Sequence, residues 1–105
     1  MSIEFSARRR SDPERMYSVS VATHEVFRRY WLPVCAKLEL FYVPLFETGL
    51  PVAGDDIRDL LNELGMIKSY IASAPKYGVI RERVDQLSDA LREAGRNGDF
   101  DIYIG

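Results

Sequence analysis

Two stretches near the start of the chain alternate between apolar and polar residues. In residues 2–8 every second residue is apolar, and residues 16–22 repeat the alternation. A period of two is typical of a half-buried strand. Asp12 and Pro13 lie between the two runs and favour a turn. The pattern therefore predicts an antiparallel hairpin.

The spacing of apolar residues then lengthens to three and four, which predicts a helix. Thr23 is placed to cap its first turn, because a threonine hydroxyl can accept a hydrogen bond from a free backbone N–H. Pro33 lies inside the apolar stripe, and its ring clashes with the preceding turn of a helix. The stripe keeps its phase across Pro33, so we expect one kinked helix that ends near residue 38.

Two further helices are predicted in the second half of the chain. Residues 57–74 keep a helical apolar stripe after a cap at Asp55 or Asp56. In residues 80–94 the apolar spacing alternates between four and three, which is typical of a helix that packs along another helix. Gly95 follows and suits the left-handed residue that ends many helices.

Residues 39–46 are the ambiguous part of the pattern. Their aromatic and β-branched side chains favour a short edge strand that Pro44 limits, although a continued helix is the alternative. Glycine and proline indicate a loop in residues 47–55. Residues 100–104 alternate again and predict a last strand, which we expect beside the first one.

The order of these elements predicts a single domain over residues 1–105 with an α+β fold. We expect a small antiparallel sheet of three to four strands, with about three helices packed on one face. Hydrophobic residues make up 47% of the chain and charged residues 29%, the ordinary mixture of a globular domain.

Composition excludes several classes of protein. A net charge of −2 argues against nucleic acid as the main partner. The most apolar stretch, residues 31–46, contains Lys37 and Glu39 and is too short to span a membrane. With Cys35 as the sole cysteine, no internal disulfide can form, which favours a reducing cytoplasm.

The sequence contains no motif that is typical of a class of enzyme. We therefore predict no catalytic residue, metal site or cofactor. His24 and Cys35 are each the only residue of their kind. On a continuous helix they would lie roughly 16 Å apart. A nucleophile and its base need to be about 3 Å apart. We therefore expect Cys35 to be buried and inert.

Charge is unevenly distributed along the chain. Residues 31–66 hold two basic and six acidic residues, and four of the acids lie in or just before the first of the two long helices: Asp55, Asp56, Asp59 and Glu63. Acids in a first turn favour the positive end of the helix dipole, which is the structural explanation. The alternatives are a patch that faces a partner, a metal site or an acid–base pair.

The aromatic residues of the 39–46 segment add to this asymmetry. If Tyr42 and Phe46 point outward beside the acidic helix start, they form the aromatic anchors and charged rim of an interface. An edge strand here would also allow a homodimer through its unpaired backbone groups. Alternatively, a helix covers the segment and the aromatic residues belong to the core.

One segment resembles a known family. Residues 31–71, "WLPVCAKLELFYVPLFETGLPVAGDDIRDLLNELGMIKSYI", are similar to small bacterial immunity proteins, the inhibitors encoded beside polymorphic or contact-dependent toxins. The similarity lies in an aromatic helix, an apolar segment, the "GLPV" loop and the acid-capped "DDIRDLLNEL" helix. It implies a non-enzymatic protein that binds one toxin domain tightly and blocks its active site or substrate path. No catalytic residue carries over.

Together these observations predict a cytoplasmic protein-binding module of the immunity type. The residues expected to bind the partner are Tyr42, Phe46, Asp55, Asp56, Asp59 and Glu63. The acids would meet a basic cleft and speed association, while the aromatic residues would slow release. If so, replacing Asp56 and Asp59 by Lys should weaken the complex without lowering the melting temperature. The alternatives are a small α+β enzyme or ligand-binding domain with a pocket between sheet and helices, and a homo-oligomer that pairs through residues 39–46.

Overall fold

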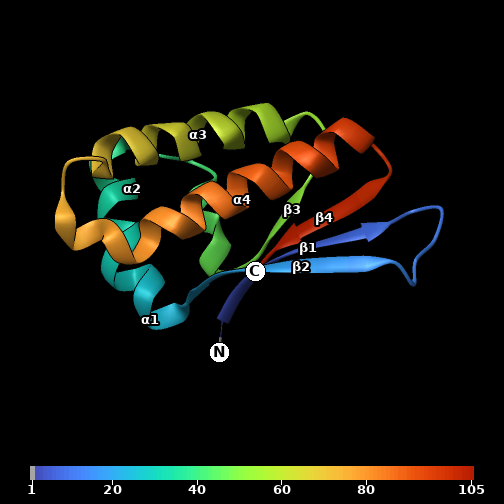
Figure 1. The fold of residues 1–105 in the computed structure, drawn as a ribbon, viewed down its shortest axis with the longest axis horizontal. Helices are drawn as coiled ribbons and strands as arrows, with labels where there is room; N and C mark the ends of the chain where they lie inside the picture. The colour runs from blue at the N-terminus through green and yellow to red at the C-terminus, as the bar shows by residue number, and fades with distance from the viewer. Residues whose placement is uncertain (1) are drawn as a thin grey trace.

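The protein has two layers, a sheet and a set of helices that cover one of its faces (Figure 1). The computed structural model describes residues 2–105, and within them the antiparallel sheet has four strands in the order β2-β1-β4-β3. The strands are β1 (Ser2–Arg9), β2 (Met16–Thr23), β3 (Leu50–Val52) and β4 (Phe100–Ile104). The α+β prediction is confirmed.

The predicted hairpin forms the first half of the sheet. β1 and β2 pair antiparallel, and Ile3, Phe5 and Ala7 of β1 are fully buried against the helices. β4 lies on the other side of β1, as expected, with Phe5 opposite Ile104. Both ends of the described chain therefore lie in the two central strands of the sheet.

One helical stretch runs from His24 to Leu38 and contains a widened turn. It consists of α1 (His24–Val26), a π-helical turn η1 (Phe27–Trp31) and α2 (Leu32–Leu38). Thr23 caps it as predicted, because its Oγ1 accepts a hydrogen bond from the Val26 N–H at 3.1 Å. In the π turn the Leu32 N–H donates to the Phe27 carbonyl oxygen, and this irregular turn immediately precedes Pro33. A left-handed residue, Glu39 at φ 55°, ends the stretch.

The edge strand predicted for residues 39–46 was wrong. Val43–Glu47 form a short 3₁₀ helix, η2, and the strand at this edge of the sheet is β3, in the stretch predicted to be a loop. Pro44 is the second residue of this 3₁₀ helix, and its fixed φ suits the first turn of a helix. Pro51 lies in β3, where an edge tolerates a missing N–H. A homodimer through residues 39–46 therefore loses its structural basis.

The two long helices are α3 (Asp56–Ile71) and α4 (Gly78–Asn97), joined by the 3₁₀ turn η3 (Pro75–Tyr77). They lie side by side above the sheet (Figure 1). The prediction that Gly95 ends α4 was wrong. Gly98, at φ 76°, is the left-handed residue, and its N–H donates to the Ala94 carbonyl oxygen at 3.1 Å. Gly95 lies inside the last turn of the helix.

A single apolar core fills the space between the two layers. Trp31, Phe5, Phe27 and Phe46 are its largest fully buried side chains. The opposite face of the sheet has no helical cover among the described residues, and its side chains include exposed Glu4 and Arg8. The core therefore lies on one side of the sheet, between the sheet and the helices.

Candidate functional site

Glu63, one of the predicted partner-binding residues, is a structural group. Its side chain lies on α3 and is only 8% exposed. The carboxylate accepts backbone N–H groups from Phe41 at 2.9 Å, Tyr42 at 3.0 Å and Val43 at 2.9 Å. Hydrogen bonds to a carboxylate are about twice as strong as neutral ones. Glu63 therefore fixes residues 41–43 in place and has little surface to offer a partner.

Asp56 is also occupied within the protein. Its Oδ1 accepts a hydrogen bond from the Tyr42 hydroxyl at 3.1 Å, and its Oδ2 accepts the Ala53 N–H at 3.1 Å. The hydrogen bond to Asp56 raises the pKa of Tyr42 above its usual range, because it favours the protonated phenol. Asp55 takes the N-cap position of α3, although its side chain makes no capping hydrogen bond within the described chain. Asp56 instead accepts hydrogen bonds from Tyr42 and Ala53, which both precede the helix.

The other three predicted residues divide between core and surface. Phe46 is fully buried, with its ring centre 6.1 Å from that of Phe27. Asp55 and Asp59 are exposed. Asp59 has a neighbouring cation, Arg58, at 3.9 Å, but at such an exposed position the pair contributes little. The structure thus brings Tyr42, Asp56, Asp59 and Glu63 together and places Phe46 in the core.

Phe41 is the surface residue that the predicted set lacks. It is 68% exposed, although its backbone N–H is held by Glu63. Its ring meets the Tyr42 ring edge to face, with 5.0 Å between their centres. In the predicted strand, Tyr42 and Phe46 would share one face of the sheet and Phe41 would lie on the other, so Phe41 was not among the predicted binding residues. Pro44 was the available signal, since proline is typical of a first helical position.

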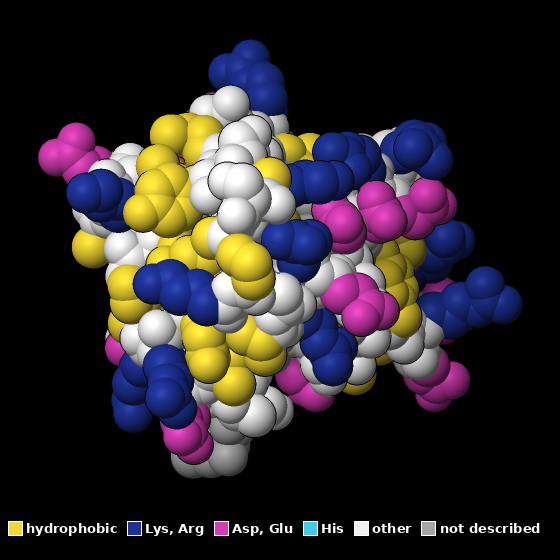
Figure 2. Space-filling view, turned by 60° about the vertical axis from the view of Figure 1, so that its left-hand side comes forward, with side chains coloured by type: hydrophobic (Ala, Val, Ile, Leu, Met, Phe, Trp, Pro, Cys, Tyr) yellow, Lys and Arg dark blue, Asp and Glu magenta, His cyan; other side chains and the backbone are white. Residues whose placement is uncertain are grey.

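A shallow apolar groove lies on the outer side of α3, beside α2. It has a volume of about 630 Å³, and its lining includes Leu38, Met66 and Tyr70. Met66 and Tyr70 are both exposed. Hydrophobic side chains gather over the end of the molecule that Figure 2 brings forward, with basic side chains among them. Apolar surface thus continues along α3 in the direction away from its acidic start.

A pairing of Cys35 with His24 has no support in the geometry. Cys35 is buried, and burial raises the pKa of its thiol to about 12. Almost no thiolate, the form that reacts, is therefore present near neutral pH. Within residues 2–105, no group of three or more His, Cys, Asp or Glu side chains is arranged to hold a metal ion.

Comparison with protein-family models, curated proteins and solved structures gives no match to this chain. Among the helices of residues 2–105, none combines the length and apolar character needed to cross a membrane. The assignment of a function therefore rests on the surface of the molecule itself.

Proposed function

We propose that this chain is a non-enzymatic protein-binding module, and that its partner contacts an acidic–aromatic surface formed by Phe41, Tyr42, Asp55, Asp56 and Asp59. The observation that carries the proposal is the exposed Phe41 ring on a backbone fixed by Glu63. A large apolar side chain held in one place loses little freedom on binding. Aromatic side chains of this kind dominate the binding energy of many interfaces.

Charge around Phe41 supports a basic partner. Asp55 and Asp59 are exposed at the start of α3, and the negative charges of Asp56 and Asp59 act on the Tyr42 phenol. Carboxylates at the rim of an interface accelerate association with a positive surface, and this effect weakens as salt increases. Phe41 would then provide the apolar contact that slows release.

The kind of partner follows from the resemblance of residues 31–71 to immunity proteins. We propose that the partner is a bacterial toxin domain with a basic cleft, and that binding covers the cleft in the cytoplasm of the cell that makes the inhibitor. The whole surface lies within that segment, which contains Phe41, Tyr42 and the acid-rich start of α3. The inhibitor needs no reactive group of its own for this role.

The test begins with purification from the native host at its natural level and identification of a stoichiometric partner by mass spectrometry. Dissociation constants are then measured for Phe41→Ala and for Asp55→Lys with Asp59→Lys. The sequence alone suggested Asp56 as the residue to substitute. We choose Asp55 instead, because a substitution of Asp56 would break two internal hydrogen bonds. We expect Phe41→Ala to weaken binding about tenfold or more, and the charge reversals to reduce mainly the association rate.

The control for Phe41→Ala is Met16→Ala, which removes another exposed apolar side chain, in the sheet. Melting temperatures of Phe41→Ala and Met16→Ala should stay close to that of the natural protein, because neither side chain is buried. The charge reversals should lower the melting temperature slightly, because they place cations at the positive end of α3. Unchanged affinity in both Phe41→Ala and the double charge reversal would refute this surface. Recovery of the protein without any partner would refute the inhibitor function.

A further inference from the structure

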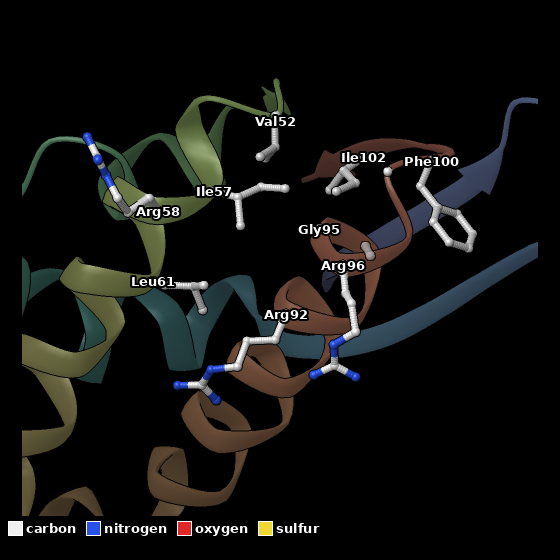
Figure 3. Close-up of a pocket in the computed structure, with 12 residues that line it drawn as sticks. Val52, Ile57, Arg58, Leu61, Arg92, Gly95, Arg96, Phe100 and Ile102 are labelled. Atoms are coloured by element: carbon white, nitrogen blue, oxygen red, sulfur yellow. The ribbon is translucent and has the colours of Figure 1, made fainter.

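A second cavity, which we call the arginine pocket, lies at the start of α3, and Leu61 lines both this cavity and the apolar groove. It has a volume of about 490 Å³ and lies between the first turn of α3, the last turns of α4 and the strands β3 and β4. Figure 3 shows Val52, Ile57 and Ile102 converging on it from three different elements. The size is within the usual range for small-molecule sites, about 300–1,000 Å³.

The pocket exists because α4 carries small residues at this end. Ala94, Gly95 and Gly98 all line it. A Cβ atom on Gly95 would come within 3.3 Å of the Ile57 Cδ1, so the two helices approach closely there. Gly98 turns the chain with its left-handed conformation and directs it into β4. Because these residues have no side chain larger than a methyl group, the space between the helix ends and the sheet edge stays open.

The charge of the lining is of one sign. Arg58, Arg92 and Arg96 are its charged residues, and no acidic side chain is among the described residues that line it. Each of these arginines has an acidic neighbour, but that neighbour lies outside the lining. In Figure 3 the Arg58 guanidinium points away from the cavity. Arg92 and Arg96 extend from successive turns of α4, and their guanidinium groups also point away from Val52 and Ile102, so they would turn toward a bound ligand.

The arginine side chains are held only by exposed local ion pairs. Arg92 is 3.3 Å from Asp89 and Arg96 is 3.1 Å from Glu93, each pair spanning three residues of α4. Exposed pairs of this kind contribute little to stability. A ligand can therefore recruit both guanidinium groups at small cost. Guanidinium groups match the geometry of carboxylate and phosphate groups, with which they form paired hydrogen bonds.

We propose that the arginine pocket binds a small organic anion with an apolar body. The apolar part would lie against Val52, Ile57, Leu61 and Ile102, and the anionic group would bind Arg92 and Arg96. This site is distinct from the acidic–aromatic surface, since Ile57 and Leu61 project from a different side of α3 than Asp59. The proposal does not depend on the protein partner.

Binding can be located by NMR without knowing the natural ligand. Gly54, Gly95 and Gly98 line the pocket, and glycine amides resonate in an uncrowded region of the nitrogen–proton spectrum. The probes are decanoate and decyl phosphate, with decanol and decyltrimethylammonium as the matched neutral and cationic compounds. We expect at least one of the two anions to shift all three glycine amides, and Gly49 and Gly78, which lie outside the pocket lining, to stay unchanged.

Two double variants then test the role of charge. Arg92→Met with Arg96→Met keeps most of the side-chain length and removes both charges. Arg15→Met with Arg29→Met removes the same charge from exposed sites outside the pocket lining. We expect the first pair to weaken binding of the anion about tenfold or more, and the second pair to leave it nearly unchanged.

Any one of three results would overturn the proposal. Absence of glycine shifts with both anions at about 1 mM, where binding would contribute only about 4 kcal/mol, would rule out a useful site. Equal binding of decanol or decyltrimethylammonium would show an apolar pocket without anion recognition. An equal loss of anion affinity in both double variants would mean that the anion responds only to the net charge of the protein. All three results are independent of whether a protein partner is found.

Discussion

The two sides of α3 use charge in opposite ways. On the side that faces residues 41–56, Glu63 and Asp56 are engaged by the backbone and by Tyr42, so their charges stabilise the fold. On the side that faces the end of α4, Arg92 and Arg96 have only exposed ion pairs within their own helix. The acids that look like a binding patch in the sequence are partly structural. The arginines, which attract no attention in the sequence, remain available to a ligand.

This difference shows that the number of charges in a segment does not measure what the segment can bind. A charged side chain serves recognition only when its own protein has not already satisfied it. Exposure alone is also an incomplete guide, because Tyr42 is partly exposed while its hydroxyl is occupied by Asp56. The two sides can be separated by substitutions that remove one charge or hydroxyl at a time.

The largest expected effect is that of Glu63→Leu. Three backbone N–H groups would lose their acceptor at a position that the helix covers. Leaving buried donors unpaired costs about 1–3 kcal/mol each, and partial access of water reduces the sum. We expect the free energy of unfolding to fall by about 3 kcal/mol, measured by denaturation in guanidinium chloride.

Asp59→Asn is the matched control for Glu63→Leu, because Asp59 is an exposed acid on the same helix. Its effect on the free energy of unfolding should stay within about 0.5 kcal/mol. If Glu63→Leu were equally mild, the three hydrogen bonds would not hold residues 41–43 as described, and the two sides of α3 would no longer differ.

Tyr42→Phe should have a smaller effect. It removes one hydrogen bond to Asp56 and leaves the ring in place, so we expect a small fall in the free energy of unfolding at neutral pH. The pKa of the folded Tyr42 is raised, so the folded state holds the phenol proton more tightly than the unfolded state. This stabilisation is complete below pH 10, the ordinary pKa, and is lost as the pH rises through the folded pKa.

Denaturation at a series of alkaline pH values checks this prediction. The natural protein should lose stability above pH 10 more steeply than Tyr42→Phe. Tyr17, whose pKa burial raises, and the buried Cys35 thiol add to the fall in both proteins. Parallel curves for the two proteins would mean that the Tyr42 hydroxyl is not tied to Asp56 in solution.

A small stability effect is also predicted for the side of α3 that faces the end of α4. Arg92→Met with Arg96→Met breaks two exposed ion pairs, each of which contributes a few tenths of a kcal/mol. The free energy of unfolding should therefore change by less than about 1 kcal/mol. Thermal unfolding of the variant and of the natural protein gives this value directly. A much larger loss would mean that these arginines hold the fold, as Glu63 does.

The parts of the fold that could be predicted from the sequence are those with local periodicity. The hairpin, the capped helix after Thr23, both long helices and the pairing of the first and last strands follow from spacing that each segment contains. The end of α4 was misplaced because its apolar stripe stops at Ala94. Arg96 and Asn97 continue the helix with exposed polar residues, which leave no trace in such a stripe.

The conformation of residues 39–52 could not be predicted from the sequence, for a different reason. Their conformation depends on Glu63, which lies about twenty residues further along the chain and accepts the N–H groups of residues 41–43. An alternating pattern cannot reveal such a long-range acceptor. The same limit applies to the candidate sites: the acidic cluster was visible, but not which acids are occupied. Nor did spacing indicate that Arg58, Arg92 and Arg96 share one pocket.

The position of β4 has a consequence for the order in which the protein folds. β4 lies between β1 and β3, and Glu4 and Gly105 exchange both of their backbone hydrogen bonds. During synthesis, the ribosome releases the first hairpin long before residues 100–104 exist. Until then β1 has one open edge and β3 has no neighbour to pair with. Contacts between such distant segments slow folding, so the sheet is completed in a single late step after its final strand emerges.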